Sequence, residues 1–239
     1  MLKLLFITTT LLSNIALANT NTIVNNLAPF FGKIDKQDIV GTQFDGVVEV
    51  IIRNPIDSLL VSADGRYIIQ GDVIDLTKRQ LMPVSNKVKS IKKDLIKSIN
   101  EDNKIIYPAA NEKHVIHVFT DVDCPFCRKL HNNIDVMNDL GITIKLLAAP
   151  IASLHPNAQG KMEKIWCADN RNEAMDEYNE DKTIPDSKDC NNPVANQLAI
   201  SKRLSVSGTP AIFLEDGSHL AGYLSPTALL KTIKDSIGE

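Results

Sequence analysis

The sequence predicts a mixed α+β and α/β protein, with a small N-terminal domain of short strands followed by a larger α/β domain. Three observations favour this division. They are β-branched segments around an Asp-Gly turn, an amphipathic helix after them, and a strand–helix–strand unit that starts near residue 114. With 239 residues, the chain is long enough to bury the core of one large domain or of two small ones.

Composition and charge narrow the class of protein. Hydrophobic residues make up 44% of the chain and charged residues 23%, which is ordinary for a globular protein and argues against a disordered one. The 26 Lys and Arg against 29 Asp and Glu give a net charge of -3, so the basic excess of a nucleic-acid-binding protein is missing. Because of this charge balance, we expect no nucleic-acid partner. Four cysteines are too few for a fold that depends on disulfides.

The N-terminus has the pattern of a secretory signal peptide. Lys3 is followed by the apolar run Leu4–Leu12 and by the small-residue sequence Ala16-Leu17-Ala18. The alternative, a membrane anchor, needs a longer apolar segment than this one. We expect residues 1–18 to be cleaved after Ala18 and the mature protein to be exported, to a compartment where disulfides persist.

The N-terminal domain is predicted to span residues 19–84. Its expected elements are a short helix over 21–27 and a half-buried strand over 47–52. An Asp-Gly pair at Asp64-Gly65, between the expected strands 58–62 and 66–70, predicts a hairpin, because glycine accepts the positive φ of a tight turn. This region contains no Cys and no His, so we expect its role to be structural or interactive.

A linker helix is predicted within residues 85–103. Ser85 or Asn86 is a suitable N-cap, and lysines occupy several faces of the helix. We interpret the lysines as a solvated face rather than a binding patch. Apolar residues recur at helical spacing, at Val88, Ile91, Leu95 and Ile99.

The larger domain is predicted to span residues 104–239. A strand over 114–119, a helix over 124–138 and a strand over 142–147 make a βαβ unit. The segment 158–203 is mostly helical in pattern. The last expected elements are a hairpin of strands 211–214 and 219–221 and a helix over 225–237 that has Pro226 at its first position.

The sequence Cys124-Pro125-Phe126-Cys127 lies between a predicted strand and a predicted helix and is the main candidate for chemistry. Cys124 then stands at a helix N-terminus, where free N–H groups and the helix dipole favour a thiolate. Pro125 suits the first helical position, since no N–H is needed there. The spacing brings both sulfurs together across one turn, so that Cys124 can attack a disulfide and Cys127 can resolve the mixed disulfide.

Three other interpretations of this motif are weaker. A zinc site needs two more ligands, and Cys167 and Cys190 lie far along the chain without C-x-x-C spacing. Haem attachment requires a histidine directly after the second cysteine, where this chain has Arg128. A structural disulfide across so short a loop adds little stability. We therefore expect neither a metal nor a cofactor.

The charged residues on either side of the motif have opposite effects on the thiolate form of Cys124. Asp121 and Asp123 precede it and disfavour a thiolate, whereas Arg128 and Lys129 follow it and favour one. The helix N-terminus is therefore the contribution to thiolate stability that the sequence supports. His131 is expected to be an ordinary surface or boundary residue, with tuning of the nucleophile as the alternative.

The other two cysteines, Cys167 and Cys190, enclose a polar and mostly helical stretch. In an exported protein the default expectation for such a pair is a structural disulfide, worth about 3 kcal/mol in the loop-entropy account. A second redox pair is the alternative. Trp166, directly before Cys167, is expected to serve packing rather than function.

Thr209-Pro210 follows Val206-Ser207-Gly208 and directly precedes a predicted strand, a place where proline is tolerated only at the strand start. On the sequence pattern alone, an X-Pro bond of this kind is expected to be trans.

Several segments together resemble a known family. They are Glu112–Asp121, the C-x-x-C with Lys129-Leu130-His131 after it, Ile165-Trp166-Cys167, Val206–Pro210, and Asp64-Gly65 followed by Ile68–Gly71. The combination is similar to the bacterial periplasmic thiol:disulfide interchange proteins of the DsbC/DsbG type, and the similarity covers essentially the whole chain after the signal peptide.

The resemblance implies a thioredoxin-fold catalytic domain with a helical insertion at about 155–204, a linker helix and a cystatin-like N-terminal dimerisation domain. It implies a V-shaped homodimer in the periplasm, with two active sites facing a shared apolar cleft. It also implies that Thr209-Pro210 is a cis-proline loop facing Cys124, and that Cys167–Cys190 is a structural disulfide.

The resemblance further implies a function. A membrane thiol reductase of the DsbD type keeps this family reduced, so we expect a disulfide isomerase and reductase that corrects misfolded, disulfide-containing exported proteins. One departure is the dipeptide Pro125-Phe126, where the isomerase branch typically has Gly-Tyr. Because this dipeptide tunes redox poise, a DsbG-like sulfenic-acid reductase and an oxidase stay open as alternatives. A redox-independent holdase chaperone that uses the dimer cleft is a further alternative.

Overall fold

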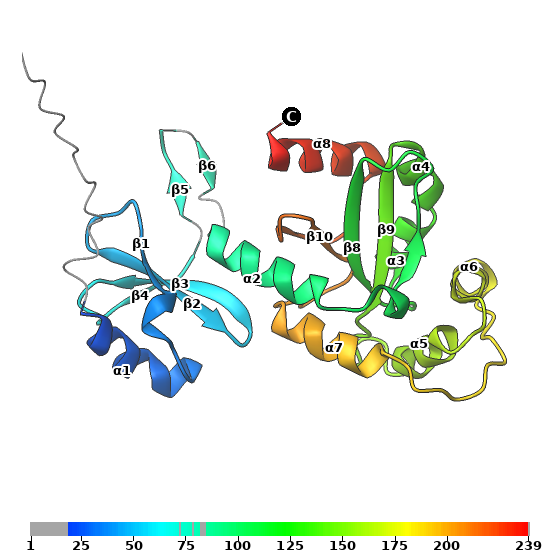
Figure 1. Cartoon of the computed structure of the whole chain (residues 1–239), viewed down its shortest axis with the longest axis horizontal. Helices are drawn as coiled ribbons and strands as arrows, with labels where there is room; N and C mark the ends of the chain where they lie inside the picture. Colours follow the sequence, from blue (N-terminus) through cyan, green and yellow to red (C-terminus); the bar gives the residue numbers. More distant parts are fainter. Residues whose placement is uncertain (1–18, 72, 78, 82–84, 239) are drawn as a thin grey trace, which may run out of the picture. The chain divides into compact units, whose positions relative to one another are not determined.

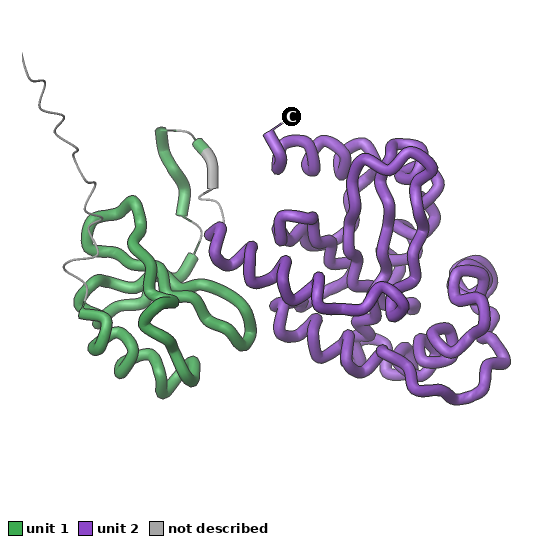
Figure 2. Tube along the Cα trace, in the orientation of Figure 1, with its two compact units in different colours: residues 1–83 green, residues 84–239 purple. Residues whose placement is uncertain are grey.

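The computed structural model describes residues 19–71, 73–77, 79–81 and 85–238. The expected signal peptide and its cleavage after Ala18 lie outside these residues. Contacts within the chain divide it into two compact units, residues 1–83 and 84–239 (Figure 2). No helix in the described part of the chain is long and apolar enough to cross a membrane.

The first unit is an antiparallel sheet with one helix (Figure 1). Four strands run in the order β1-β2-β3-β4, and β5 and β6 form a separate two-stranded pair. The elements are α1 (Thr20–Phe31), a 3-10 turn η2 (Lys36–Asp38), β1 (Ile39–Gly41), β2 (Val47–Arg53), β3 (Ile56–Ser62), β4 (Ile68–Ile69), β5 (Ile74–Asp75) and β6 (Gln80–Leu81).

The hairpin predicted around Asp64-Gly65 is confirmed, with Val61 paired to Ile68 across it. Gly65 has a φ of +74°, and a Cβ atom there would lie 3.1 Å from the backbone nitrogen of Ile23 in α1. The turn thus needs glycine both for its backbone conformation and for the close approach of the helix. The helix predicted over 21–27 is longer in the structure, and β1 was not predicted because three residues give too short a pattern.

The second unit is a five-stranded sheet in the order β11-β10-β8-β9-β7, in which only β8 and β9 are parallel. Helices α4 and α7 pack on β9, and α6 packs on β7 (Figure 1). The elements are α2 (Asn86–Lys97), a 3-10 turn η3 (Glu101–Asn103), β7 (Ile105–Tyr107), β8 (His114–Thr120), α3 (Pro125–His131), α4 (Ile134–Asp139), β9 (Ile142–Ala148), α5 (Ala158–Trp166), α6 (Arg171–Asp181), α7 (Val194–Arg203), β10 (Ala211–Leu214), β11 (His219–Ala221) and α8 (Pro226–Ile237).

The predicted βαβ unit is confirmed in its strands, but its helix is wrong in one respect. A single helix was expected over 124–138, whereas α3 and α4 are separated at Asn132 and Asn133. Asn133 leaves helical geometry, with a φ of -113°, and its side-chain amide donates to the carbonyl of Lys129 at 2.7 Å. An asparagine side chain that bonds to nearby backbone competes with the helical hydrogen bonds, which accounts for the break.

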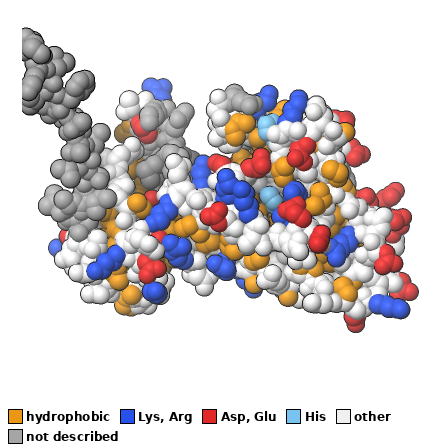
Figure 3. Space-filling view, viewed as in Figure 1, with side chains coloured by type: hydrophobic (Ala, Val, Ile, Leu, Met, Phe, Trp, Pro, Cys, Tyr) orange, Lys and Arg blue, Asp and Glu red, His pale blue; other side chains and the backbone are white. Residues whose placement is uncertain are grey.

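The helix expected to be a linker, α2, belongs to the second unit. It buries Val88 and Ile96, and Lys89 pairs with Asp216 in the β10–β11 turn at 3.1 Å. The expectation of a fully solvated lysine face is wrong for Lys92, which is only 8% exposed. On the face of the second unit seen in Figure 3, basic, acidic and hydrophobic side chains lie among one another.

The core of the second unit lies between the sheet and the helices. Trp166 is fully buried there, and its indole N–H donates to the carbonyl of Asn103 at 2.9 Å, so the packing role expected for it is confirmed. Strand β7, which was not predicted, pairs with β9 at the edge of this sheet.

Two histidines share a row on the sheet face of the second unit. His117 in β8, Phe213 in β10 and His219 in β11 are directly opposite one another, and the rings of Phe213 and His219 stack at 4.6 Å. Burial, with Lys92 as a second cause, lowers the pKa of His219 to about 4. Burial, with Lys104 and Lys145 nearby, lowers the pKa of His117 to about 4. Both rings are therefore neutral in the folded protein at neutral pH.

This burial predicts acid-sensitive stability. In the unfolded chain these histidines bind protons below a pKa of about 6.5, whereas in the folded protein they do so only near pH 4. Their contribution to the free energy of unfolding is therefore complete above pH 6.5 and is lost as the pH drops toward 4. Each histidine contributes at most about 1.4 kcal/mol per pH unit in this window. His219→Phe keeps the stacked ring and removes one titrating group, so denaturant unfolding between pH 7 and pH 4 should show a shallower loss than in the wild type. Equal slopes for the two proteins would contradict this account.

Candidate active site

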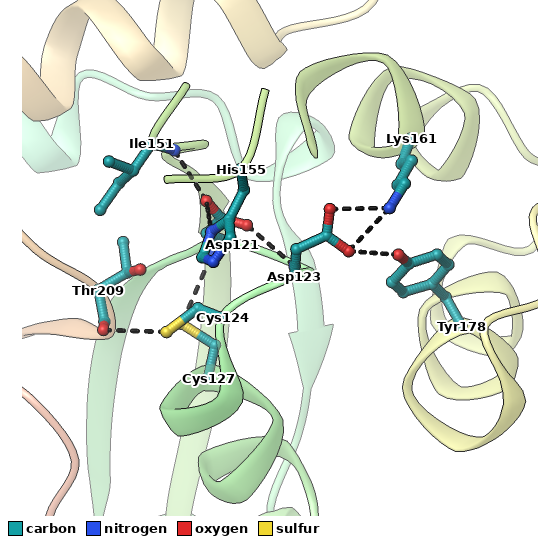
Figure 4. A network of polar contacts seen from close by, with 9 residues as sticks. All are labelled: Asp121, Asp123, Cys124, Cys127, Ile151, His155, Lys161, Tyr178 and Thr209. Atoms are coloured by element: carbon teal, nitrogen blue, oxygen red, sulfur yellow. Dashed lines mark hydrogen bonds and ion pairs between the residues drawn. The ribbon is translucent and has the colours of Figure 1, made fainter. Parts of the chain in front are cut away.

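The C-x-x-C lies where β8 ends and α3 begins, with its side chains gathered at the helix N-terminus (Figure 4). Cys124 is the N-cap of α3 in an extended conformation, and Pro125 occupies the first turn. The N–H of Arg128 donates to the carbonyl of Cys124 at 3.1 Å, which closes that turn. Phe126 points outward and is 58% exposed, so it offers an apolar surface beside the sulfurs.

Both cysteines of the motif are free thiols, and both are largely buried, with 7% of Cys124 and 4% of Cys127 exposed. The Cys124 thiol lies 3.3 Å from the carbonyl oxygen of Thr209, to which it donates. The backbone N–H of Asp121 points to the sulfur of Cys127 at 3.5 Å. The cysteine pair is thus enclosed between the start of α3 and the Thr209-Pro210 loop (Figure 4).

The peptide bond between Thr209 and Pro210 is cis, as the family resemblance implied and against the expectation from sequence pattern alone. The side-chain hydroxyl of Thr209 is buried and has no hydrogen-bond partner in the described structure.

The acidities of the two thiols diverge. A hydrogen bond from the Cys127 thiol is the main cause that lowers the pKa of Cys124 to about 5; burial opposes it, and backbone N–H groups of Cys127 and Phe126 add to it. Burial, and the same hydrogen bond given to Cys124, raise the pKa of Cys127 far above its ordinary value. At neutral pH the site therefore holds one thiolate and one neutral thiol.

The two acidic neighbours, whose effect the sequence left open, both have hydrogen-bonding partners. Asp121 is fully buried, and its carboxylate accepts from the N–H of Ile151 at 2.7 Å and pairs with the ring of His155 at 3.0 Å. Asp123 pairs with Lys161 and accepts from the hydroxyl of Tyr178. Sequence reasoning missed His155, Lys161 and Tyr178, because they lie in or near the helical insertion and no local spacing relates them to the motif.

The remaining candidates lie elsewhere in the second unit. Cys167 and Cys190 are bonded to each other, and the disulfide joins the end of α5 to the loop before α7. His131 pairs with Asp176 at 2.8 Å and has its ring edge-on to Tyr107, and burial lowers its pKa. Among the residues that the structure describes, no group of three His, Cys, Asp or Glu could hold a metal ion.

Comparisons with known proteins identify the family. The family described as thioredoxin-like domain matches residues 101–237, and the N-terminal domain of disulfide bond isomerase proteins matches residues 14–86. The thiol:disulfide interchange protein DsbC of Escherichia coli K12 is 36% identical over 208 residues, which covers 86% of this chain and 83% of that protein. The chain belongs to the DsbC family. DsbC of Haemophilus influenzae is 35% identical over 180 residues, which covers 74% of this chain and 76% of that protein.

Solved structures share the fold over more than half of this chain. A disulfide interchange protein from Neisseria gonorrhoeae is 30% identical with a TM-score of 0.53, and the match covers 57% of this chain and 97% of that one. The catalytic domain of Proteus mirabilis ScsC gives the same TM-score at 17% identity, covering 64% of this chain and 99% of that one, and shares the fold alone. The expected thioredoxin fold with an N-terminal DsbC domain is thereby confirmed.

The divergent acidities predict selective alkylation in this DsbC-family protein. With the C-x-x-C reduced, iodoacetamide at pH 6 should modify Cys124 and spare Cys127, because only the first is a thiolate. The rate of Cys124 alkylation, followed by peptide mass spectrometry, should rise with pH around a midpoint near 5. A midpoint near 8.5, the ordinary value for a cysteine, would contradict the proposed asymmetry.

Proposed function

We propose that this protein is an exported disulfide isomerase and reductase in which Cys124 is the nucleophile and Cys127 the resolving thiol. The observation that carries the proposal is the asymmetry of the pair, a sulfur with a pKa of about 5 at the start of α3 beside a buried sulfur that stays protonated. Membership of the DsbC family supports the same activity.

The first step is exchange with a non-native disulfide. The Cys124 thiolate attacks one sulfur of the substrate, the substrate S–S bond breaks, and a mixed disulfide to Cys124 forms while one substrate thiolate leaves. In isomerisation, another substrate thiolate then attacks the mixed disulfide, a new substrate S–S bond forms, and Cys124 departs as a thiolate. No electrons are gained or lost overall, and the low pKa of Cys124 makes it a good leaving group.

Reduction is the competing exit from the same intermediate. Cys127 attacks the sulfur of Cys124, the bond between Cys124 and the substrate breaks, and the proton from Cys127 is taken up by the departing substrate thiolate. The substrate leaves as a dithiol, and a Cys124–Cys127 disulfide remains. Because burial and hydrogen bonding keep Cys127 protonated, this exit is slowed and the mixed disulfide lives longer. A long-lived mixed disulfide gives substrate thiols time to attack, which favours isomerisation.

The neighbouring residues have supporting roles in this proposal. Pro125 sets the start of α3, and the exposed ring of Phe126 contacts apolar segments of a misfolded substrate. Thr209 and Pro210 form the loop that faces Cys124, where the backbone carbonyl of Thr209 accepts from the Cys124 thiol. The Cys167–Cys190 disulfide braces the insertion and takes no part in exchange.

The proposed protein is a periplasmic homodimer whose C-x-x-C is kept reduced by an electron donor. Residues 19–84 are the dimerisation domain of a homodimer, and residues 104–239 are the catalytic domain, to which the linker helix within residues 85–103 is docked. The match of residues 14–86 to the N-terminal isomerase domain supports dimerisation. The protein acts in the periplasm after cleavage behind Ala18. Each reductive exit consumes the dithiol, so a membrane thiol reductase of the DsbD type is proposed as the electron donor.

The nucleophile assignment predicts a trapped intermediate. Cys127→Ala removes the reductive exit, so incubation with a scrambled multi-disulfide protein should accumulate mixed disulfides that join the substrate to Cys124. Non-reducing gels and peptide mass spectrometry measure this, with Cys124→Ala as the matched control that forms none. Adducts through Cys127 in the control, or none in either variant, would contradict the assigned roles.

A further inference from the structure

Asp123 directly precedes the nucleophile, and its carboxylate is directed toward the helical insertion (Figure 4). The ammonium group of Lys161 in α5 donates to both carboxylate oxygens, at 2.9 and 2.8 Å. The hydroxyl of Tyr178 in α6 donates to one of them at 2.5 Å. Lys161 and Asp123 are only 27% and 20% exposed, so solvent screens this pair less than a surface ion pair.

The pairing keeps both groups charged. Burial alone would raise the pKa of Asp123, but the hydrogen bonds from Lys161 and Tyr178 outweigh it and the net effect lowers that pKa. The hydrogen bond to Asp123 is also the main cause that raises the pKa of Lys161. An unpaired carboxylate one residue before Cys124 would disfavour the thiolate, because like charges at short range oppose each other.

The insertion holds both partners in place. Met162 and Ile165 anchor α5 in the core, and Tyr178 is itself only 2% exposed. The Cys167–Cys190 disulfide fixes the end of α5. Lys161 and Tyr178 therefore meet Asp123 with little freedom to move away.

We propose that Lys161 and Tyr178 are positioning residues for the thiol–disulfide reaction, which act through Asp123 to keep the thiolate form of Cys124 favoured. This rests on the proposed function, in which Cys124 is the nucleophile, and gives the insertion a part in the chemistry. Other charged groups near Asp123 are Asp121 and His155 beside the motif, Arg128 on α3 and Lys182 at the end of α6. None of these donates a hydrogen bond to the Asp123 carboxylate among the described contacts.

The test is the pH dependence of Cys124 alkylation in the full mature chain, with the C-x-x-C reduced and the Cys167–Cys190 disulfide intact. Lys161→Met leaves the Asp123 carboxylate without its cation and should raise the pKa of Cys124 by about 0.5 to 1 unit. The alkylation rate at pH 5 then falls about two- to fivefold, because fewer molecules carry the thiolate. Tyr178→Phe, which removes one hydrogen bond, should shift the profile in the same direction by less.

Three variants separate an electrostatic role from a merely structural one. Asp123→Asn combined with Lys161→Met removes the carboxylate as well and should return the profile to that of the wild type. Lys161→Arg keeps the cation and should also match the wild type. Lys164→Met removes another lysine of α5, which pairs with the exposed Asp189 and not with Asp123. This variant should leave the profile unchanged.

A wild-type profile in both Lys161→Met and Tyr178→Phe would overturn the inference, as would an equal shift in Lys164→Met. If Lys161→Met does not fold, as judged by circular dichroism, Tyr178→Phe and the double variant decide. Failure of the inference is distinguishable from failure of the proposed function. In the first case the wild type still alkylates at Cys124 with an acidic midpoint and still forms substrate adducts; in the second, the wild type itself lacks the acidic midpoint.

Discussion

The interaction between the two neighbouring thiols, which lowers the pKa of Cys124 and raises that of Cys127, is the feature on which the proposed chemistry depends. One group stabilises a charge on its neighbour while burial prevents it from carrying a charge itself. The end of β8 and the start of α3 place the two cysteines one helical turn apart, and the Thr209 carbonyl lies against the sulfur of Cys124. A symmetric pair of exposed thiols would have no such division of roles.

The electrostatics of the site extend beyond the motif. The two carboxylates that could have opposed the thiolate are both paired, Asp121 with His155 and Asp123 with Lys161. The partner of Asp123 comes from the insertion, which a disulfide braces. The four cysteines thus fall into a pair of free thiols and a disulfide-bonded pair. In the proposed function one pair performs exchange, and the other pair is a disulfide in the insertion that supplies Lys161.

What the sequence could predict was local. A C-x-x-C between a strand and a helix, the Asp64-Gly65 hairpin and the parallel strands of the βαβ unit depend on residues close together in the chain, and each was predicted. The break at Asn133 was missed because one side-chain hydrogen bond outweighed helical periodicity. The partners of the two carboxylates were missed because only the folded insertion brings them near, and the docking of α2 was missed because it depends on a contact with Asp216 far along the chain.

Isomerisation of a scrambled multi-disulfide protein tests the central claim most directly. The reduced protein should restore native disulfides with turnover, and it should do so faster than it reduces a protein sulfenic acid under the same conditions. Cys124→Ala should abolish the activity, because without the acidic thiolate no mixed disulfide forms. Undiminished rescue by a variant with both Cys124 and Cys127 replaced by alanine would contradict the account and indicate a holdase. Rapid sulfenic-acid reduction without isomerisation would contradict it in favour of thiol protection.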